Sequence, residues 1–216
     1  GAGQFGEKAS QYYEKFYEHP ANMLALMERA VELGWGIQPF VLPGLMRVLL
    51  ELRERVGEYK VVFSAGMRDL GSEIQEASEF EASPICIHAS IADRAKVEAL
   101  EAHFQEIVST GSLPGIVTHS PGTTIERAQG TLCRLIMAPM NRLGWAMEPD
   151  AKASLRAIVR SRIPILAKKV LAAGRIPPEE GIRYVVEQGV GGICVGAVSE
   201  EEIEEDNALL QNLGFI

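Results

Sequence analysis

The fold is decided by Pro164-Ile-Leu-Ala-Lys-Lys-Val170, a short apolar run, and by the amphipathic segment Pro177–Gln188 that follows it. Short Ile- and Val-rich runs with little alternation are typical of strands that are buried on both faces, as in parallel sheets. Two prolines and two glutamates open the second segment and Gly189 follows it, which is the usual punctuation of a helix. Together the two segments predict one strand–helix unit.

The same pattern recurs along the chain. Further strands are predicted at Gly36–Leu42, Lys60–Ala65, Pro84–Ala89, Gly115–His119, Arg134–Ala138 and Gly192–Val198. The helices between them are predicted at Pro43–Val56, Leu70–Phe80, Asp93–Val108, Thr123–Gly130, Pro149–Ser161 and Ser199–Leu213. Strands that alternate with helices imply parallel pairing with right-handed crossovers.

An eighth unit fits at the front, with Gly1–Phe5 as the end of a strand and Asn22–Leu33 as its helix. Division of 216 residues by eight gives 27 residues per unit, the size of one strand–helix pair. The sequence therefore predicts an α/β fold, a single (β/α)8 TIM barrel with short loops that spans residues 1–216. A doubly wound open sheet is the alternative, and Ile182–Val186 could be a strand in place of Gly1–Phe5. Because the chain begins with glycine, a few residues are expected to precede it.

Composition excludes several classes of partner. The net charge is −8 and Lys and Arg form no basic cluster, so neither nucleic acid nor an anionic membrane is expected to bind. No apolar run approaches the roughly 18 to 20 residues that span a bilayer, and no signal peptide is recognised. Cys86, Cys133 and Cys194 are expected to be buried reduced thiols of a cytoplasmic protein. The expected partner is a small-molecule ligand, and a homo-oligomer is possible.

In barrels of this type the active site lies at the C-terminal ends of the strands. His88 and His119 end neighbouring predicted strands, so two imidazoles are expected at one mouth, where they could transfer protons. Only Asp69 and Asp93 offer a carboxylate there, so we do not expect a divalent metal. Substrate-binding residues are expected at the same strand ends and in the loops that follow: Gln4, Gln38, Asn141, Lys169, Arg175, Gly196 and Ser199.

Lys168 and Lys169 interrupt an otherwise apolar strand, which is rare for lysine. Side chains alternate along a strand, so one lysine should point into the barrel and the other toward the helices. An inward lysine could bind an anion, or could form a Schiff base if burial lowers its pKa. We expect catalysis by His88, His119 and Lys168. Small-residue loops at 171–175, 196–199 and 120–124 are candidate anion sites.

Two C-terminal stretches, Ala167–Tyr184 and Gly192–Asp206, resemble the aldo-keto reductases, and weaker similarity extends back to Ile85-Cys-Ile-His88. That family consists of NAD(P)H-dependent (β/α)8 barrels that reduce carbonyl compounds. The resemblance implies a barrel and places His88 where the family carries its catalytic histidine. The family's lysine position is held by Gly66, and no aspartate or tyrosine lies between Gly36 and Leu50.

These departures give a leading hypothesis and two alternatives. The leading hypothesis is an enzyme that acts on a small anionic or carbonyl metabolite, closer to a lyase or isomerase than to an oxidoreductase. The first alternative is an NAD(P)H-dependent reductase with a rearranged site, although Glu202 and Asp206 would repel the 2′-phosphate of NADP. The second is a non-catalytic barrel that binds a ligand or assembles through Tyr12, Tyr13, Phe16 and Tyr17. No cofactor is expected with the leading hypothesis.

Overall fold

The computed structural model describes residues 20–39 and 45–216. Their main feature is a parallel sheet whose strands follow one another in chain order, each paired with the next. The strands are β1 (Phe63–Ala65), β2 (Ile85–Ile87), β3 (Pro114–Val117), β4 (Leu135–Pro139), β5 (Ile165–Lys168) and β6 (Gly192–Ile193). A parallel bridge between Ile37 and Val61 continues the order by one position before β1. This is the strand order of a (β/α)8 barrel.

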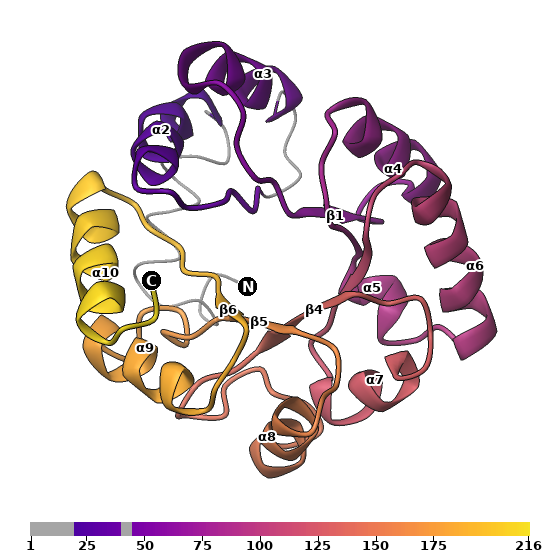
Figure 1. The fold of residues 1–216 in the computed structure, drawn as a ribbon. Coiled ribbons are helices and arrows are strands. Elements are labelled where there is room, and N and C mark those ends of the chain that lie inside the picture. The colour runs from indigo at the N-terminus through magenta and orange to yellow at the C-terminus, as the bar shows by residue number, and fades with distance from the viewer. Residues whose placement is uncertain (1–19, 40–44) are drawn as a thin grey trace.

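Helices surround the strands (Figure 1). They are α2 (Leu24–Glu32), α3 (Leu45–Val56), α4 (Leu70–Glu79), α5 (Ala89–Ala92), α6 (Val97–Ser109), α7 (Pro121–Ala128), α8 (Ala151–Val159), α9 (Pro178–Glu187) and α10 (Glu200–Asn212), with a 3-10 turn, η3 (Pro20–Met23), before α2. Side chains cap several of them at the N-terminus. For example, the side chains of Asp69, Asp150 and Ser199 each accept a hydrogen bond from a backbone amide of the first turn. The donors are Ser72, Ala153 and Glu202, respectively.

The predicted units from the strand at Lys60–Ala65 onward are confirmed, and several bounds are corrected. The helix predicted at Asp93–Val108 begins four residues later, at Val97, as α6, and a short helix outside the prediction, α5, ends just before Asp93. Ile182–Val186 belongs to α9 and is not a strand. The predicted strand at Gly36–Leu42 is reduced to the bridge at Ile37 in its described part, and Gly1–Phe5 lies outside the described residues.

The strands separate two apolar clusters. The outer cluster packs the sheet against the helices and contains alternate strand residues such as Ile85, Ile87 and Ala167. The inner cluster lies on the opposite face of the sheet and contains Val62, Cys86, Ala89, Val117, Leu135, Met137, Leu166 and Cys194. Strand side chains alternate between the two clusters, so the assignment of any strand residue to one face follows from its neighbours.

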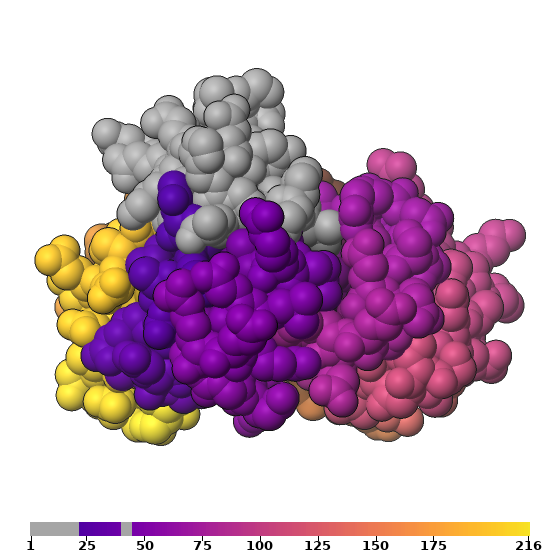
Figure 2. Space-filling view, turned by 90° about the horizontal axis from the view of Figure 1, so that it is seen from above, coloured from indigo at the N-terminus to yellow at the C-terminus, as the bar shows by residue number. Residues whose placement is uncertain are grey.

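The C-terminal helix, α10, packs beside the first α-helix of the described residues, α2. In Figures 1 and 2, α10 lies beside α2, although about 170 residues separate the pairs that join them. Trp35 Nε1 donates to Asn207 Oδ1 over 3.0 Å, and Arg29 pairs with Glu204 at 2.8 Å. These contacts place α2 and α10 as neighbours, as a barrel of consecutive units requires.

All three cysteines are free thiols, with Cys86 and Cys133 buried and Cys194 partly buried. Burial raises the pKa of Cys194 to about 11 and that of Cys133 to about 12, so both are protonated near neutral pH. Within the described ranges, none of the helices has both the length and the apolar character needed to cross a membrane.

The inner cluster explains why β3 carries a glycine. A Cβ on Gly115 would lie 2.6 Å from Cys86 Sγ and 2.9 Å from the carbonyl oxygen of Leu135. We therefore expect Gly115→Ala to lower the free energy of unfolding by about 1 to 3 kcal/mol, the usual cost of overpacking. Gly196→Ala is the matched control, since a Cβ there meets no atom of residues 20–39 or 45–216 within 4 Å. Urea denaturation measures both variants, and equal midpoints would contradict this packing.

Candidate functional site

Lys168 lies on the inner face of the sheet at the carboxyl end of β5. Its neighbour Ala167 belongs to the outer cluster and Leu166 to the inner one, so alternation turns Lys168 inward. This agrees with the expectation that one of the two lysines points into the barrel. Lys168 pairs in register with Pro139, the last residue of β4, so its side chain starts at the level where the strands end.

The surroundings of Lys168 disfavour its charged form. Its side chain is partly buried, and the ion pairs found among residues 20–39 and 45–216 do not include it. Burial, and after it the charge of Lys169, lower the pKa of Lys168 to about 7, against weaker opposing effects of Cys194, Asp93 and Cys86. At neutral pH a large fraction of this side chain is therefore the free amine, the nucleophilic form of lysine.

His88 and His119 lie side by side at the ends of neighbouring strands. Their ring centroids are 6.5 Å apart and their planes are nearly perpendicular, at 83°. Burial, then the charges of Lys168 and Lys169, lower the pKa of His119 to about 4. Burial and Lys168 also lower the pKa of His88. Both rings are thus neutral near pH 7, and each can donate one hydrogen bond and accept another.

The hydrogen bonds of His88 fix where its proton lies. The backbone amide of Ser90 donates to His88 Nδ1 over 3.2 Å, so Nδ1 is an acceptor and the neutral ring carries its proton on Nε2. Ser90 Oγ lies 2.9 Å from the same nitrogen and donates to the carbonyl of Gly66 over 3.3 Å. The Nε2–H group is left as the donor that His88 can offer to a ligand.

A buried carboxylate holds the loop that contains Gly66. Glu73 accepts the backbone amides of Gly66, Met67 and Arg68, and it also accepts Arg68 Nε over 2.8 Å. Burial would raise the pKa of Glu73, but these donors together lower it below its usual value. The sequence analysis missed Glu73, because its spacing on α4 is that of an ordinary helical residue.

Asp93 is occupied by its own protein partners. Its carboxylate accepts Thr118 Oγ1, Thr124 Oγ1 over 2.8 Å, and the amide of His119 over 2.9 Å. Asp69, the other carboxylate considered for a metal, caps α4. In the described part of the chain, no group of three or more His, Cys, Asp or Glu residues is arranged to hold a metal ion.

Asn141 supports a tryptophan that the sequence analysis overlooked. Its side-chain oxygen accepts the amide of Trp145 over 2.8 Å, and its side-chain nitrogen donates to the carbonyl of the same residue over 2.9 Å. The side-chain amide of Asn141 thus holds the β4–α8 loop. Its predicted role in substrate binding stays a prediction.

Lys169 and Arg175 meet at the ring that Asn141 supports. Lys169 Nζ lies 5.2 Å from the centroid of Trp145, and Arg175 Cζ lies 4.9 Å from it. The strand alternation that would turn Lys169 away from Lys168 stops at this point. The strand ends at Lys168, and Lys169 adopts a left-handed φ of 57°, so the alternation of the strand no longer applies.

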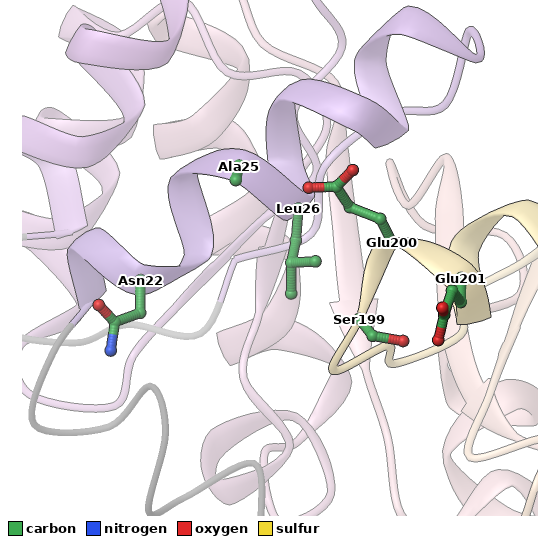
Figure 3. A pocket seen from close by; sticks show the side chains of 6 residues that line it. All are labelled: Asn22, Ala25, Leu26, Ser199, Glu200 and Glu201. Carbon is green, nitrogen blue, oxygen red and sulfur yellow. The ribbon is translucent and has the colours of Figure 1, made fainter.

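The other predicted binding residues are dispersed. Gln38 Oε1 lies 3.9 Å from Cys194 Sγ near the inner cluster, Gly196 is exposed, and Gln4 lies outside the described residues. Ser199 lines a surface cavity of about 420 Å³ between α2 and α10 (Figure 3). The other residues of this cavity are Asn22, Ala25, Leu26, Glu200 and Glu201. Because two carboxylates line it and Ser199 caps α10, this helix start is a poor site for an anion.

One more polar group lies on the inner face, at β1. Ser64 lies between Phe63 and Ala65, both in the outer cluster, so its hydroxyl faces the inner side of β1. Its Oγ is buried and has no hydrogen-bond partner among the described residues. A buried hydroxyl without a partner costs about 1 to 3 kcal/mol unless a ligand or water satisfies it.

The comparisons with known proteins bear on the fold. No family model and no curated protein matches the sequence. Among solved structures, the chain is similar to a protein described as an aldo-keto reductase from Pseudomonas aeruginosa, with a TM-score of 0.66 and 17% identity over 91% of this chain and 83% of that one. The chain has a (β/α)8-barrel fold.

Two other solved structures support the same conclusion. A truncated 3-deoxy-D-arabino-heptulosonate 7-phosphate synthase from Thermotoga maritima has a TM-score of 0.59 and 17% identity, over 90% of this chain and 81% of that one. A protein described as a dihydrodipicolinate synthetase from Pseudomonas aeruginosa has a TM-score of 0.53 and 15% identity, over 91% and 77%. At these identities the likeness establishes the fold and leaves the chemistry to the site residues.

Proposed function

We propose that this chain is an enzyme that acts on a small carbonyl metabolite, with Lys168 as the reacting amine. The observation that carries the proposal is the position of Lys168, inward at the carboxyl end of β5, beside neutral imidazoles and outside the ion pairs of the described residues. Active sites of (β/α)8 barrels lie at this end of the strands. A partly buried lysine without a paired carboxylate is costly to keep, which supports a functional role.

The proposed reaction is a condensation of the Lys168 amine with a carbonyl group, which releases water. The lone pair of Lys168 Nζ forms a bond to the carbonyl carbon, and the C=O π bond breaks as its oxygen takes a proton. Loss of the hydroxyl group with a second proton then gives an imine and one water molecule. The two protons that the nitrogen loses equal the two that the oxygen gains, so they pass from nitrogen to oxygen with no net exchange with solvent. His88 can donate a hydrogen bond to the oxygen through Nε2–H, and His119, whose pKa is about 4, can accept one from the nitrogen.

Borohydride trapping tests this role. The protein is incubated with a panel of small aldehydes and ketones, reduced with borohydride, and the modified lysine is located by mass spectrometry. We expect the unchanged protein to gain ligand mass at Lys168, and Lys168→Met to lose this adduct by at least about 100-fold, since the reacting amine is gone. Lys152→Met is the control, because Lys152 is an exposed residue of α8 and should leave the adduct intact.

Two outcomes would overturn the proposal. One is an adduct that persists in Lys168→Met, which would place the reactive amine elsewhere. The other is the absence of any adduct with every carbonyl compound of the panel. In that case a non-catalytic barrel or a nicotinamide-dependent reductase would remain, and a titration of nicotinamide fluorescence would separate these two.

A further inference from the structure

Trp145 carries two cationic side chains on one ring. The ammonium of Lys169 and the guanidinium of Arg175 both lie about 5 Å from the indole centroid, within the range of cation–π attraction. Both come from the segment that follows β5, whereas Trp145 comes from the loop after β4. Two adjacent barrel loops therefore concentrate positive charge beside the reacting lysine.

The scaffold under these cations is held firmly. Asn141 binds both the amide and the carbonyl of Trp145, and Arg175 Nη1 donates to the carbonyl of Ala172 over 2.9 Å. Lys169 and Ala172 are left-handed, with φ values of 57° and 48°, a conformation that costs non-glycine residues about 1 to 3 kcal/mol each. Such strained backbone angles persist where the surrounding contacts hold the loop in one conformation.

Lys169 adds positive charge beside Lys168 in the described part of the chain. Lys169 is adjacent to Lys168, and no ion pair links Lys169 to a carboxylate within residues 20–39 and 45–216. Glu148 is the acidic group that acts on Lys169, and its carboxylate accepts the hydroxyl of Ser120 over 3.1 Å. The charges of Lys168 and Lys169 also act together on His119. An anion bound here would relieve this repulsion.

We propose that Trp145, Lys169 and Arg175 form a subsite for an oxyanion, either a carboxylate or a phosphate. Since Lys168 is adjacent to Lys169, the substrate class is then a carbonyl compound that carries such an anionic group; this second step rests on the proposed function. The indole presents a flat apolar face, and the two cations supply the charged hydrogen bonds that recognise oxygen atoms. The N-terminus of α10 is not an alternative anion site, because Glu200 and Glu201 lie there.

Tryptophan fluorescence tests the subsite without any covalent chemistry. The chain has two tryptophans, so Trp35→Phe leaves Trp145 as the single emitter. At constant ionic strength, phosphate or acetate is exchanged for chloride. We expect a saturable change in emission with at least one of the two anions, and binding at least about tenfold weaker in Lys169→Met and in Arg175→Met. Lys152→Met, at an exposed position of α8, should bind as the parent does.

The identity of the effective anion distinguishes a phosphate from a carboxylate subsite. The subsite is overturned if neither anion gives a saturable signal, or if Lys169→Met and Arg175→Met bind as tightly as the parent. Trp35 is hydrogen-bonded to Asn207, so its replacement could unfold the protein. Calorimetric titration of the unchanged chain against Lys169→Met then gives the same comparison.

Matched carbonyl compounds test the substrate class. Glyceraldehyde 3-phosphate is compared with glyceraldehyde, and 4-oxobutanoate with butanal, by borohydride trapping at Lys168. We expect one anionic member to reach half-maximal labelling at about tenfold lower concentration than its neutral partner, and Lys169→Met to remove this preference. Equal labelling of both members overturns the substrate class and leaves the proposed function standing. If no compound labels Lys168, the proposed function fails, and the fluorescence titration still decides the subsite.

Discussion

Lys168→Met is expected to raise the free energy of unfolding at pH 6 by about 2 to 4 kcal/mol relative to the unchanged protein. Methionine has a similar length and fills the same space on the inner face of β5 without an ammonium group. Lys168 is partly buried and belongs to none of the ion pairs among the described residues, so its charge destabilises the folded state. Urea denaturation at several pH values measures the difference.

The stability gained by Lys168→Met should decrease as the pH rises. The pKa of Lys168 is about 7 in the folded protein and about 10.5 in the unfolded chain. Below pH 7 both states are protonated and the folded state carries the full cost of the buried charge. Between pH 7 and 10.5 the folded protein has lost the proton that the unfolded chain keeps, so stability rises with pH. The advantage of methionine should therefore be largest at pH 6 and vanish near pH 10.5.

Lys152→Met provides the control, because an exposed lysine should change the free energy of unfolding by no more than about 0.5 kcal/mol at any pH. If Lys168→Met is less stable than the parent at pH 6, the ammonium group is stabilised by contacts and the assigned environment is wrong. A variant that gains stability while it loses the trapped adduct would show that Lys168 is kept for function at the expense of stability.

The sequence could predict the strand–helix units because parallel strands buried on both faces need continuous apolar runs, and such runs recur along the chain. It could also predict that one lysine of the pair turns inward, since alternation depends only on the position within a strand. Its failures occurred where alternation or helical periodicity stops. Lys169 lies one residue beyond β5, and a left-handed backbone angle redirects it onto Trp145.

Other parts of the site could not be found from local pattern. Asp93 is predicted as the first residue of a helix, whereas in the structure its carboxylate binds Thr118 and the amide of His119, about 25 residues away in the chain. Asn141 is predicted as a ligand residue from its place after a strand, and the structure adds that its side-chain amide binds the backbone of Trp145. Long-range hydrogen bonds leave no periodic signal in the sequence, so these assignments required the structure.

Glu73→Gln is expected to lower the free energy of unfolding by about 3 kcal/mol at pH 7, because it disrupts a buried network of charged hydrogen bonds. The carboxylate accepts three backbone amides, those of Gly66, Met67 and Arg68, together with Arg68 Nε. Glutamine keeps the shape but replaces one acceptor oxygen by an NH₂ group, which would face donors. Urea denaturation measures the loss.

The effect of Glu73→Gln should shrink in acid. Hydrogen bonds hold the pKa of Glu73 below its ordinary value of 4.5, so the carboxylate stabilises the folded state above that value and the contribution is lost as the pH falls through the lowered folded pKa. The difference between the two proteins should be full at pH 7 and smaller in strong acid. A difference that does not change with pH would mean that the carboxylate charge has no part in holding the loop.

Glu76→Gln is the matched control for Glu73, since both carboxylates bind the guanidinium of Arg68. Arg68 Nη2 lies 2.9 Å from Glu76 Oε2, but the side chain of Glu76 is 41% exposed while that of Glu73 is fully buried. An exposed ion pair contributes about 0 to 1 kcal/mol, so Glu76→Gln should change stability little. The loop that Glu73 holds presents the carbonyl of Gly66 to Ser90, which contacts His88 Nδ1. Glu73→Gln should therefore also alter the NMR signals of the His88 ring, whereas Glu76→Gln should not.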